Sequence, residues 1–206
     1  MKRIILEFIN AILSQLNQQD TIVEACGDFD FDIEDALATT QLAHLGQYRR
    51  SGEPYLQHPL EVAEIVHNFY PGDKVLCAAA LMHDTLEDAL AQGNVQDNAE
   101  MARLIAGSFG DETSGTEVLR IVRALTHDKG SQLYSDYVVG LLDDLPALRI
   151  KLADMLHNLR SNPSLTQKKK YAAALRELYL ASNSQIPIGI SKLHWDSLLL
   201  SLKDNN

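Results

Sequence analysis

The chain has 206 residues, and 18 Lys and Arg against 28 Asp and Glu give a formal net charge of −10 at pH 7. Hydrophobic residues make up 46% and charged residues 22%, which is typical of a folded soluble chain and too apolar for a disordered one. The length fits one domain, or at most two small ones. The acidic balance argues against a nucleic-acid-binding protein and against a polybasic membrane-surface protein, but it leaves a small anionic ligand open.

The sequence carries no signal for an oxidising compartment or a membrane. Cys26 and Cys77 match no zinc-ligand or redox-pair spacing, and Cys77 lies in an apolar run typical of a buried helix. The N-terminus starts with basic residues, as a signal peptide does, yet polar residues interrupt its apolar ones. No segment approaches the roughly 20 apolar residues of a membrane span. We therefore expect a cytoplasmic protein.

Helical periodicity runs through nearly the whole chain. Apolar residues at three- and four-residue spacing predict a first amphipathic helix over about 4–16. Further helices are predicted at about 32–47, 59–69, 73–88, 98–109, 115–127, 134–144, 146–161, 166–183 and 190–203. Pro59 opens one of them and Asp73 caps the next. No stretch alternates as a strand does, so we predict an all-α fold: a single compact domain, residues 1–206, of about eight to ten helices.

The strongest chemical feature is the segment HDTLED, residues 83–88, which follows a run of eight apolar residues, 75–82. Such a run is typical of a helix packed on most sides, so we expect the polar cluster at its end to line a cleft. If the helix continues, one histidine and three carboxylates crowd about one and a half turns. Carboxylates that close repel one another, and a cation relieves the repulsion. A solvated helix end with a chance histidine is the alternative.

A second segment, residues 151–161 (KLADMLHNLRS), carries a polar line along a helix that otherwise looks like a core helix. Its leucines form one stripe, and Asp154, Asn158 and Ser161 form another at i, i+4 and i+7. Buried polar groups need partners. The line is therefore either a hydrogen-bonded seam between helices or part of a ligand site.

The third segment, residues 44–59 (HLGQYRRSGEPYLQHP), is polar and joins two predicted helices. His58 comes just before the proline that starts the next helix, where its ring can project into a cleft. Arg49 and Arg50 stand beside Ser51. A guanidinium can donate two hydrogen bonds to a phosphate and can stack on a planar ring, so the pair suits a phosphate or a planar base. An ordinary surface loop is the alternative. The basic run at 168–170 is interpreted as a solvated helix face.

The three segments together supply a ligand set of two histidines and two carboxylates: His58, His83, Asp84 and Asp154. Mixed nitrogen and oxygen ligands suit Mn²⁺ or Fe²⁺, with Zn²⁺ as an alternative, and they do not suit a structural thiolate site. Spacing alone does not establish that the segments converge, so the metal site is a hypothesis about the fold as well.

These motifs resemble a known family. The pattern H-x(24)-HD-x(69)-D, with HLGQYRRSGEPYLQHPL, AALMHDTLED and KLADMLHNLR in this order, is similar to the HD-superfamily hydrolase domain of RelA/SpoT homologues. The resemblance spans about residues 36–180, most of the chain. It implies an all-α HD domain and a Mn²⁺-dependent hydrolase that removes the 3′-pyrophosphate from ppGpp or pppGpp, giving GDP or GTP and pyrophosphate.

The resemblance also implies roles for single residues, by matching motif positions. It assigns the metal to the four ligands named above. Glu87 and Asp88 would position and activate the attacking water, which suits a carboxylate beside that water. On the substrate side, Arg49 would pack on the guanine with Arg50 and Ser51 nearby, Asn158 would touch the nucleotide, and Ser161 stands where the family often has threonine.

The sequence departs from the family in three places. Met155 replaces the basic residue that commonly follows the metal aspartate, so we expect the loss of a phosphate contact or of an outer ion pair. Thr85 and Leu86 replace a more usual valine pair, which is a packing change. The chain ends at Asn206, without room for a synthetase domain, so we expect a stand-alone small alarmone hydrolase. The terminal helices would pack on the domain or form a homo-oligomer interface.

Two alternatives to this activity stay open. The same metal site could act on another phosphorylated nucleotide, such as NADPH or (p)ppApp, because the loops that bind the base decide the substrate. A nucleotide sensor that binds without hydrolysis is the non-enzymatic alternative, and the intact pair Glu87 and Asp88 argues against it. In every case the expected partner is a small-molecule nucleotide, with neither nucleic acid nor membrane.

Overall fold

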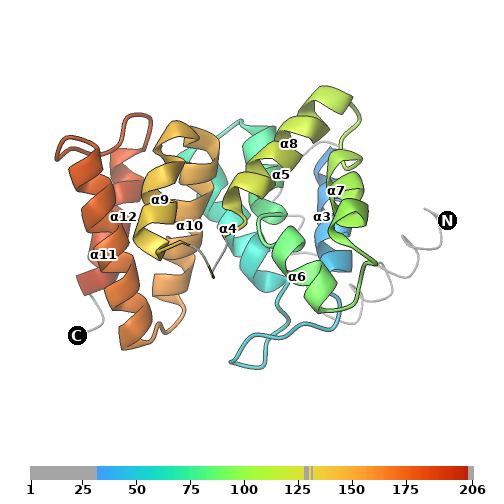
Figure 1. Ribbon diagram of the computed structural model, residues 1–206, viewed down its shortest axis with the longest axis horizontal. Coiled ribbons are helices and arrows are strands. Elements are labelled where there is room, and N and C mark those ends of the chain that lie inside the picture. The colour runs from blue at the N-terminus through green and yellow to red at the C-terminus, as the bar shows by residue number, and fades with distance from the viewer. Residues whose placement is uncertain (1–31, 128–129, 131, 204–206) are drawn as a thin grey trace.

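The computed structural model describes residues 32–127, 130 and 132–203. This part of the chain is all-α, as predicted, and has no β-strand (Figure 1). Its helices are α3 (Asp32–Ala43), α4 (Gln57–Phe69), α5 (Lys74–Leu81), α6 (Thr85–Ala91), α7 (Asn98–Ala106), α8 (Glu112–Leu125), α9 (Tyr134–Gly140), the 3-10 helix η1 (Leu141–Asp143), α10 (Leu145–Arg160), α11 (Leu165–Ala181) and α12 (Lys192–Lys203). The expected first helix at 4–16 and Cys26 lie outside the described residues.

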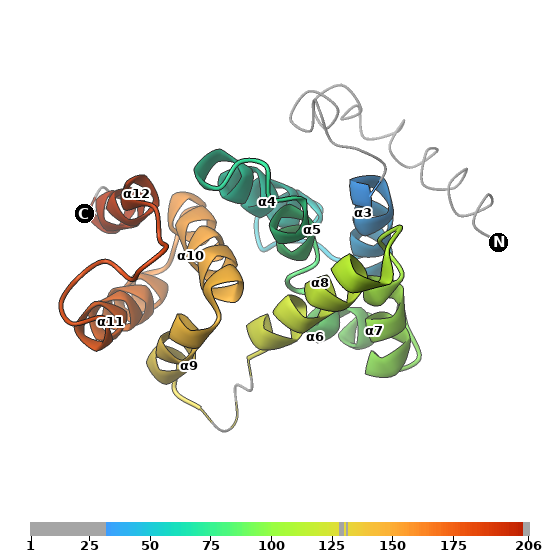
Figure 2. The same cartoon turned by 90° about the horizontal axis from the view of Figure 1, so that it is seen from above.

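The helices form two groups with α4 and α5 between them (Figures 1 and 2). Helices α9 to α12 lie on one side, and α3, α6, α7 and α8 lie on the other. Buried apolar side chains from every one of these α-helices, from Ile33 in α3 to Leu198 in α12, join one core. Within it α10 packs against α4, and α4 packs against α5, which brings the three motif-bearing segments together. No helix in the described part is long and apolar enough to span a membrane.

Acidic or hydroxyl side chains cap the N-termini of five of the described helices. Asp73 accepts a hydrogen bond from the backbone N–H of Leu76 at 2.9 Å, which confirms the predicted cap of α5. Asp97, Asp111, Asp144 and Ser164 cap α7, α8, α10 and α11 in the same way. Gly72 has φ +83° in the turn after α4, a conformation that favours glycine, so this turn ends α4 where the sequence predicted.

One predicted helix, residues 73–88, is wrong: the structure breaks it into α5 and α6 at residues 82–84. At the break the imidazole Nδ1 of His83 lies 2.8 Å from the carbonyl oxygen of Ala80. The hydroxyl of Thr85 donates to the carbonyl of Met82 at 2.7 Å. Side chains therefore replace part of the helical hydrogen bonding there. As a result His83 and Asp84 lie at a junction between helices.

The start of α4 also differs from the prediction. The helix begins at Gln57, so His58 is its second residue and lies inside the first turn, not before the helix. Pro59 is the third residue, where a helix does not need the backbone N–H that proline lacks. His58 is consequently held by a helix backbone and not by a loop.

Candidate metal centre and cavity

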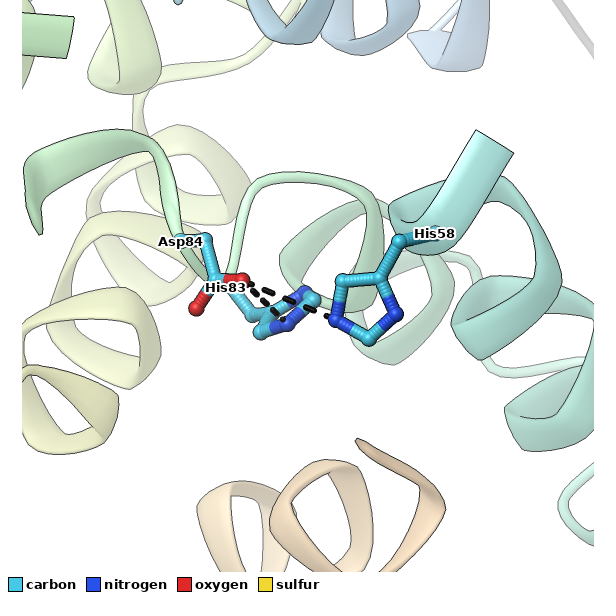
Figure 3. A group of neighbouring side chains, drawn as sticks. All are labelled: His58, His83 and Asp84. Atoms are coloured by element: carbon cyan, nitrogen blue, oxygen red, sulfur yellow. Dashed lines mark ion pairs between the residues drawn. The ribbon is translucent and has the colours of Figure 1, made fainter. Parts of the chain in front are cut away.

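Three of the four predicted metal ligands, His58, His83 and Asp84, offer ligand atoms that all lie within 4.8 Å of one another, between α4 and the α5–α6 junction. The fourth, Asp154, approaches His58 from α10. Figure 3 shows the rings of His58 and His83 facing the carboxylate of Asp84. Nε2 of His83 lies 3.1 Å and Nε2 of His58 lies 3.6 Å from Oδ2 of Asp84. Oδ1 of Asp154, from α10, is 3.3 Å from the same nitrogen of His58. Both histidines and Asp154 are buried.

Hydrogen bonds to the outer nitrogens orient the two histidine rings. Nδ1 of His83 can only donate to the Ala80 carbonyl oxygen, so in the neutral ring Nε2 carries a lone pair. His58 contacts His157 through the two Nδ1 atoms at 2.8 Å, and Nε2 of His157 lies 2.6 Å from Oε2 of Glu61. Burial and the neighbouring His58 lower the pKa of His157 to about 4, so this ring is neutral.

The carboxylate of Glu61 therefore decides which nitrogen of His58 carries the proton. It accepts the single N–H of His157 at Nε2, which leaves Nδ1 of His157 as an acceptor. Nδ1–H of His58 donates to that atom, and Nε2 of His58 points its lone pair at Asp84 and Asp154. Carboxylate–histidine arrangements of this kind orient metal ligands in proteins.

The two carboxylates are fixed by donors on their outer sides. The hydroxyl of Tyr55 donates to Oδ2 of Asp84 at 2.6 Å. The ammonium of Lys151 donates to Oδ2 of Asp154 at 2.7 Å, and the amide of Asn158 donates to Oδ1. Burial raises the pKa of Asp154, but the charge of Lys151 outweighs burial and holds this pKa well below its usual range. The aspartate is therefore ionised, as a metal ligand must be.

The residues present fit a divalent cation. Nε2 of His83 and Nε2 of His58 lie 3.1 and 3.6 Å from one oxygen of Asp84, and Asp154 adds a second carboxylate 3.3 Å from His58. Nε2 of His83 is buried and lies 3.1 Å from Oδ2 of Asp84. Burial lowers the pKa of His83, but Asp84 raises it to about 9, so a proton on this ring offsets the repulsion when no metal is bound. A metal would displace that proton, and two nitrogens with two oxygens suit Mn²⁺, Fe²⁺ or Zn²⁺.

Glu87 and Asp88 follow the ligands in the first turn of α6 and line the same cavity. Oε1 of Glu87 accepts the backbone N–H of His127 at 3.0 Å. Oδ2 of Asp88 accepts from the side-chain amide of Gln47 at 2.8 Å, and the amide oxygen of Gln47 lies 2.7 Å from Nδ1 of His44. Burial raises the pKa of Asp88. A carboxylate with a raised pKa beside a metal can accept a proton from water.

His58, Asp84 and Asp154 border a cavity of about 400 Å³, a size that suits a nucleotide-sized molecule. Its lining residues are Arg49, Tyr55, His58, Asp84, Glu87, Asp88, His127, Tyr134, Lys151, Asp154, Asn158, Lys170 and Tyr171. Arg49 reaches it from a short turn in which the backbone of Tyr48 pairs with that of Pro54. Its Nη2 donates to Oδ1 of Asn158 at 3.3 Å, so these two predicted substrate contacts meet in the cavity.

Three other predicted substrate residues are not brought into the cavity lining. Arg50 and Ser51 are exposed in the turn, where the hydroxyl of Ser51 donates to Glu53 at 3.3 Å. Ser161 is exposed at the end of α10, and its hydroxyl donates to the carbonyl oxygen of His157 at 2.9 Å. Met155, which replaces the family's basic residue, is fully buried in the core.

Several cavity residues were missed by the sequence analysis. Tyr55 sits three residues before His58, and Lys151 sits three residues before Asp154, so helical spacing could have paired Lys151 with the aspartate. Tyr134 and Tyr171 carry no such local signal. Lys169 and Lys170 are exposed, in agreement with the interpretation of this basic run as a solvated face, and Lys170 in addition lines the cavity.

Comparison with known proteins identifies the family of this chain. The family model described as "HD domain" matches residues 36–181. A GTP pyrophosphokinase from Myxococcus xanthus is 30% identical over 83% of this chain and 22% of its own length. A probable guanosine-3′,5′-bis(diphosphate) 3′-pyrophosphohydrolase from Synechocystis is 28% identical over 78% of this chain and 20% of its own.

A third relative, a GTP pyrophosphokinase from Brucella melitensis, is 31% identical over 76% of this chain and 21% of its own length. The chain thus spans about a fifth of the length of these curated relatives. The family match covers most of the chain, and the histidines and aspartates of its motifs converge in space. The chain therefore belongs to the HD-domain family and is of the RelA/SpoT type.

Proposed function

We propose that this protein hydrolyses the 3′-pyrophosphate of ppGpp and pppGpp, giving GDP or GTP and pyrophosphate, with Mn²⁺ as its metal. One observation carries the proposal: His58, His83 and Asp84 gather at one point with the carboxylate of Asp154 beside His58, and two further carboxylates line the adjoining cavity. A divalent ion held there would neutralise phosphoryl charge and lower the pKa of a water molecule.

The hydrolytic direction is preferred because of the two acids of α6. Water must add its oxygen to the phosphorus joined to the ribose O3′, and the P–O3′ bond breaks with its electrons going to O3′. Glu87 and Asp88 can hold the water and accept its proton, while O3′ takes up a proton as it leaves. The names of the relatives include both a pyrophosphohydrolase and pyrophosphokinases, so the direction rests on these residues.

The nucleoside is assigned to the end of the cavity that holds Arg49 and Asn158. The Arg49 guanidinium can stack on a purine ring while the Asn158 amide bonds to the nucleotide. Their contact at 3.3 Å keeps both side chains at the cavity before substrate binds.

The test is product analysis of ppGpp incubated with purified protein, with and without Mn²⁺. We expect GDP and pyrophosphate only when metal is present. Asp154→Ala should lose both bound metal and turnover, whereas Glu87→Ala should keep the metal and lose turnover by about 100-fold or more. Glu64→Ala, an exposed acid on α4, is the matched control and should behave as the unchanged protein.

Parallel assays separate the alternatives. Equal or greater turnover of NADPH or (p)ppApp would replace the proposed substrate while keeping the metal site. Tight nucleotide binding without any product would make the protein a sensor. Full activity of metal-free Asp154→Ala would remove the metal site from the proposal altogether.

A further inference from the structure

The wall of the cavity formed by α9 and α11 carries lysines stacked on tyrosine rings. The ammonium of Lys170 lies 4.3 Å from the ring centroid of Tyr134 and 5.1 Å from that of Tyr171. The two rings are 5.7 Å apart. Lys151 approaches Tyr134 from α10, with its Nζ 5.7 Å from the ring centroid. These four residues all line the cavity, although nothing in the proposed hydrolysis step uses Lys170 or Tyr134.

Tyr134 serves this wall through its ring and not through its hydroxyl. The hydroxyl oxygen is buried and has no hydrogen-bond partner among the described residues. A tyrosine kept for a hydrogen bond would have one. Its ring face, in contrast, holds a cation within the distance at which ammonium and aromatic rings attract. Tyr134 is therefore a platform that keeps the Lys170 ammonium over the cavity.

The position of this wall relative to the metal ligands indicates what it contacts. The ammonium of Lys151 donates to the metal ligand Asp154 at 2.7 Å, and it also lies 5.7 Å from the ring centroid of Tyr134. The same ring carries Lys170 at 4.3 Å. Tyr134 therefore connects Lys170 to the side of the cavity where the carboxylate of Asp154 lies.

The charges beside Tyr134 suit a phosphate. Lys151 and Lys170 both bring an ammonium group to a cavity that also contains four carboxylates, those of Asp84, Glu87, Asp88 and Asp154. A diphosphate attached at the metal centre extends one phosphate beyond the reacting phosphorus, and that group needs a cation there.

We propose that Lys170, held on the ring of Tyr134, forms a subsite for the outer phosphate of the diphosphate that the enzyme releases. The proposal rests on the proposed function for the identity of the diphosphate. The subsite itself is defined by an anionic phosphate group and can be measured without turnover.

The test uses calorimetric titration of the Mn²⁺-loaded protein with inorganic pyrophosphate and, separately, with GDP. Lys170→Gln should weaken pyrophosphate binding about tenfold or more, since a charge-assisted contact to phosphate is lost, and should leave GDP binding within about twofold. Lys169→Gln removes the same charge from the neighbouring exposed residue and should change neither affinity. In turnover of ppGpp, Lys170→Gln should raise KM more than it lowers kcat.

Two substitutions of Tyr134 distinguish the contribution of its ring from that of its hydroxyl. Tyr134→Phe keeps the ring and should bind pyrophosphate as the unchanged protein does. Tyr134→Leu removes the ring and should weaken binding toward the level of Lys170→Gln, with the melting temperature and Mn²⁺ affinity recorded as checks on folding.

Several results overturn the inference. They are unchanged pyrophosphate affinity in Lys170→Gln, no pyrophosphate binding by the unchanged protein, or a loss confined to GDP, which would assign the subsite to the 5′-phosphates. If ppGpp is hydrolysed and Lys170→Gln binds pyrophosphate normally, the inference fails and the proposed function stands. If pyrophosphate binding depends on Lys170 and no nucleotide is hydrolysed, the proposed function fails and the phosphate subsite stands.

Discussion

Replacement of Lys151 by methionine tests the electrostatics of the centre directly. Lys151→Met keeps most of the volume of the side chain but leaves the Asp154 carboxylate without its cation, at a site where the side chains are 15% and 8% exposed. At the N···O distance of 2.7 Å and an effective dielectric constant of about 20, the Coulomb energy of the pair is about 6 kcal/mol.

The cost of burying the lysine offsets part of that energy, so removing one partner of such a pair costs about 3–5 kcal/mol. Asn158 still donates to Asp154, which favours the lower value. We expect the metal-free variant to lose about 3 kcal/mol of unfolding free energy, or about 6–12 °C in melting temperature for a chain of this size. Urea and thermal denaturation of the metal-free protein measure it.

Two comparisons make this prediction specific. The double variant Lys151→Met with Asp154→Asn has neither charge and should recover most of the lost stability, because no buried charge is left unpaired. Mn²⁺ should stabilise the single variant more than the unchanged protein, since it supplies the missing positive charge. A loss below about 1 kcal/mol in metal-free Lys151→Met would refute the reasoning that Lys151 holds Asp154 ionised.

Three further predictions concern packing, acid stability and metal. Gly115→Ala should cost about 1–3 kcal/mol in denaturation, because its Cβ would lie 2.0 Å from the backbone oxygen of Ala106, whereas Gly140→Ala, with open space, should be neutral or slightly stabilising. Burial lowers the pKa of His194 from 6.5 to about 4, so its contribution to stability is complete above pH 6.5 and is lost as the pH falls toward 4, by up to about 3 kcal/mol. His194→Phe keeps the stacking on Phe69 and should reduce the loss of stability between pH 6.5 and 4, measured by urea denaturation. An unchanged loss over that pH range would contradict the assignment of this loss to His194. Mn²⁺ at 100 times its Kd should raise stability by about 2.7 kcal/mol, and a chelator should reverse the gain; no change in melting temperature would exclude tight binding to the native state.

The fold was predictable from the sequence because the signals for it are local. Apolar spacing and the carboxylate cap at Asp73 decide where helices form, and the structure agrees with them within a few residues at most ends. The break between α5 and α6 was not predictable in the same way. It depends on the side chains of His83 and Thr85 bonding to backbone carbonyls, in competition with a continuous helix that the apolar run favours equally.

For the site, motif positions predicted which residues face one another but not what holds them. The four ligands were named from their motifs. The structure groups His58, His83 and Asp84 and places Asp154 3.3 Å from His58, and their role as ligands stays a prediction. Glu61 contacts His157, and Gln47 donates to Asp88. Both contacts join elements that are distant in sequence, so they depend on packing that no local pattern encodes. Tyr134 and Lys170 were missed for the same reason: only the packing of α9 on α11 makes a ring and an ammonium neighbours.

The predicted metal ligands come from α4, the α5–α6 junction and α10, and this has a consequence for how the protein unfolds. A metal bound to both His58 and Asp154 ties together two points that are 96 residues apart (154 − 58) along the chain. Such a link removes conformational freedom from the unfolded chain much as a long-range crosslink does. With such a metal bound, helices α9 to α12, which lie together on one side of α4 and α5 (Figure 2), would separate from the rest only after Asp154 of α10 releases the ion. Opening of that group, measured by hydrogen exchange, should therefore slow when metal is added, even in variants without catalytic activity.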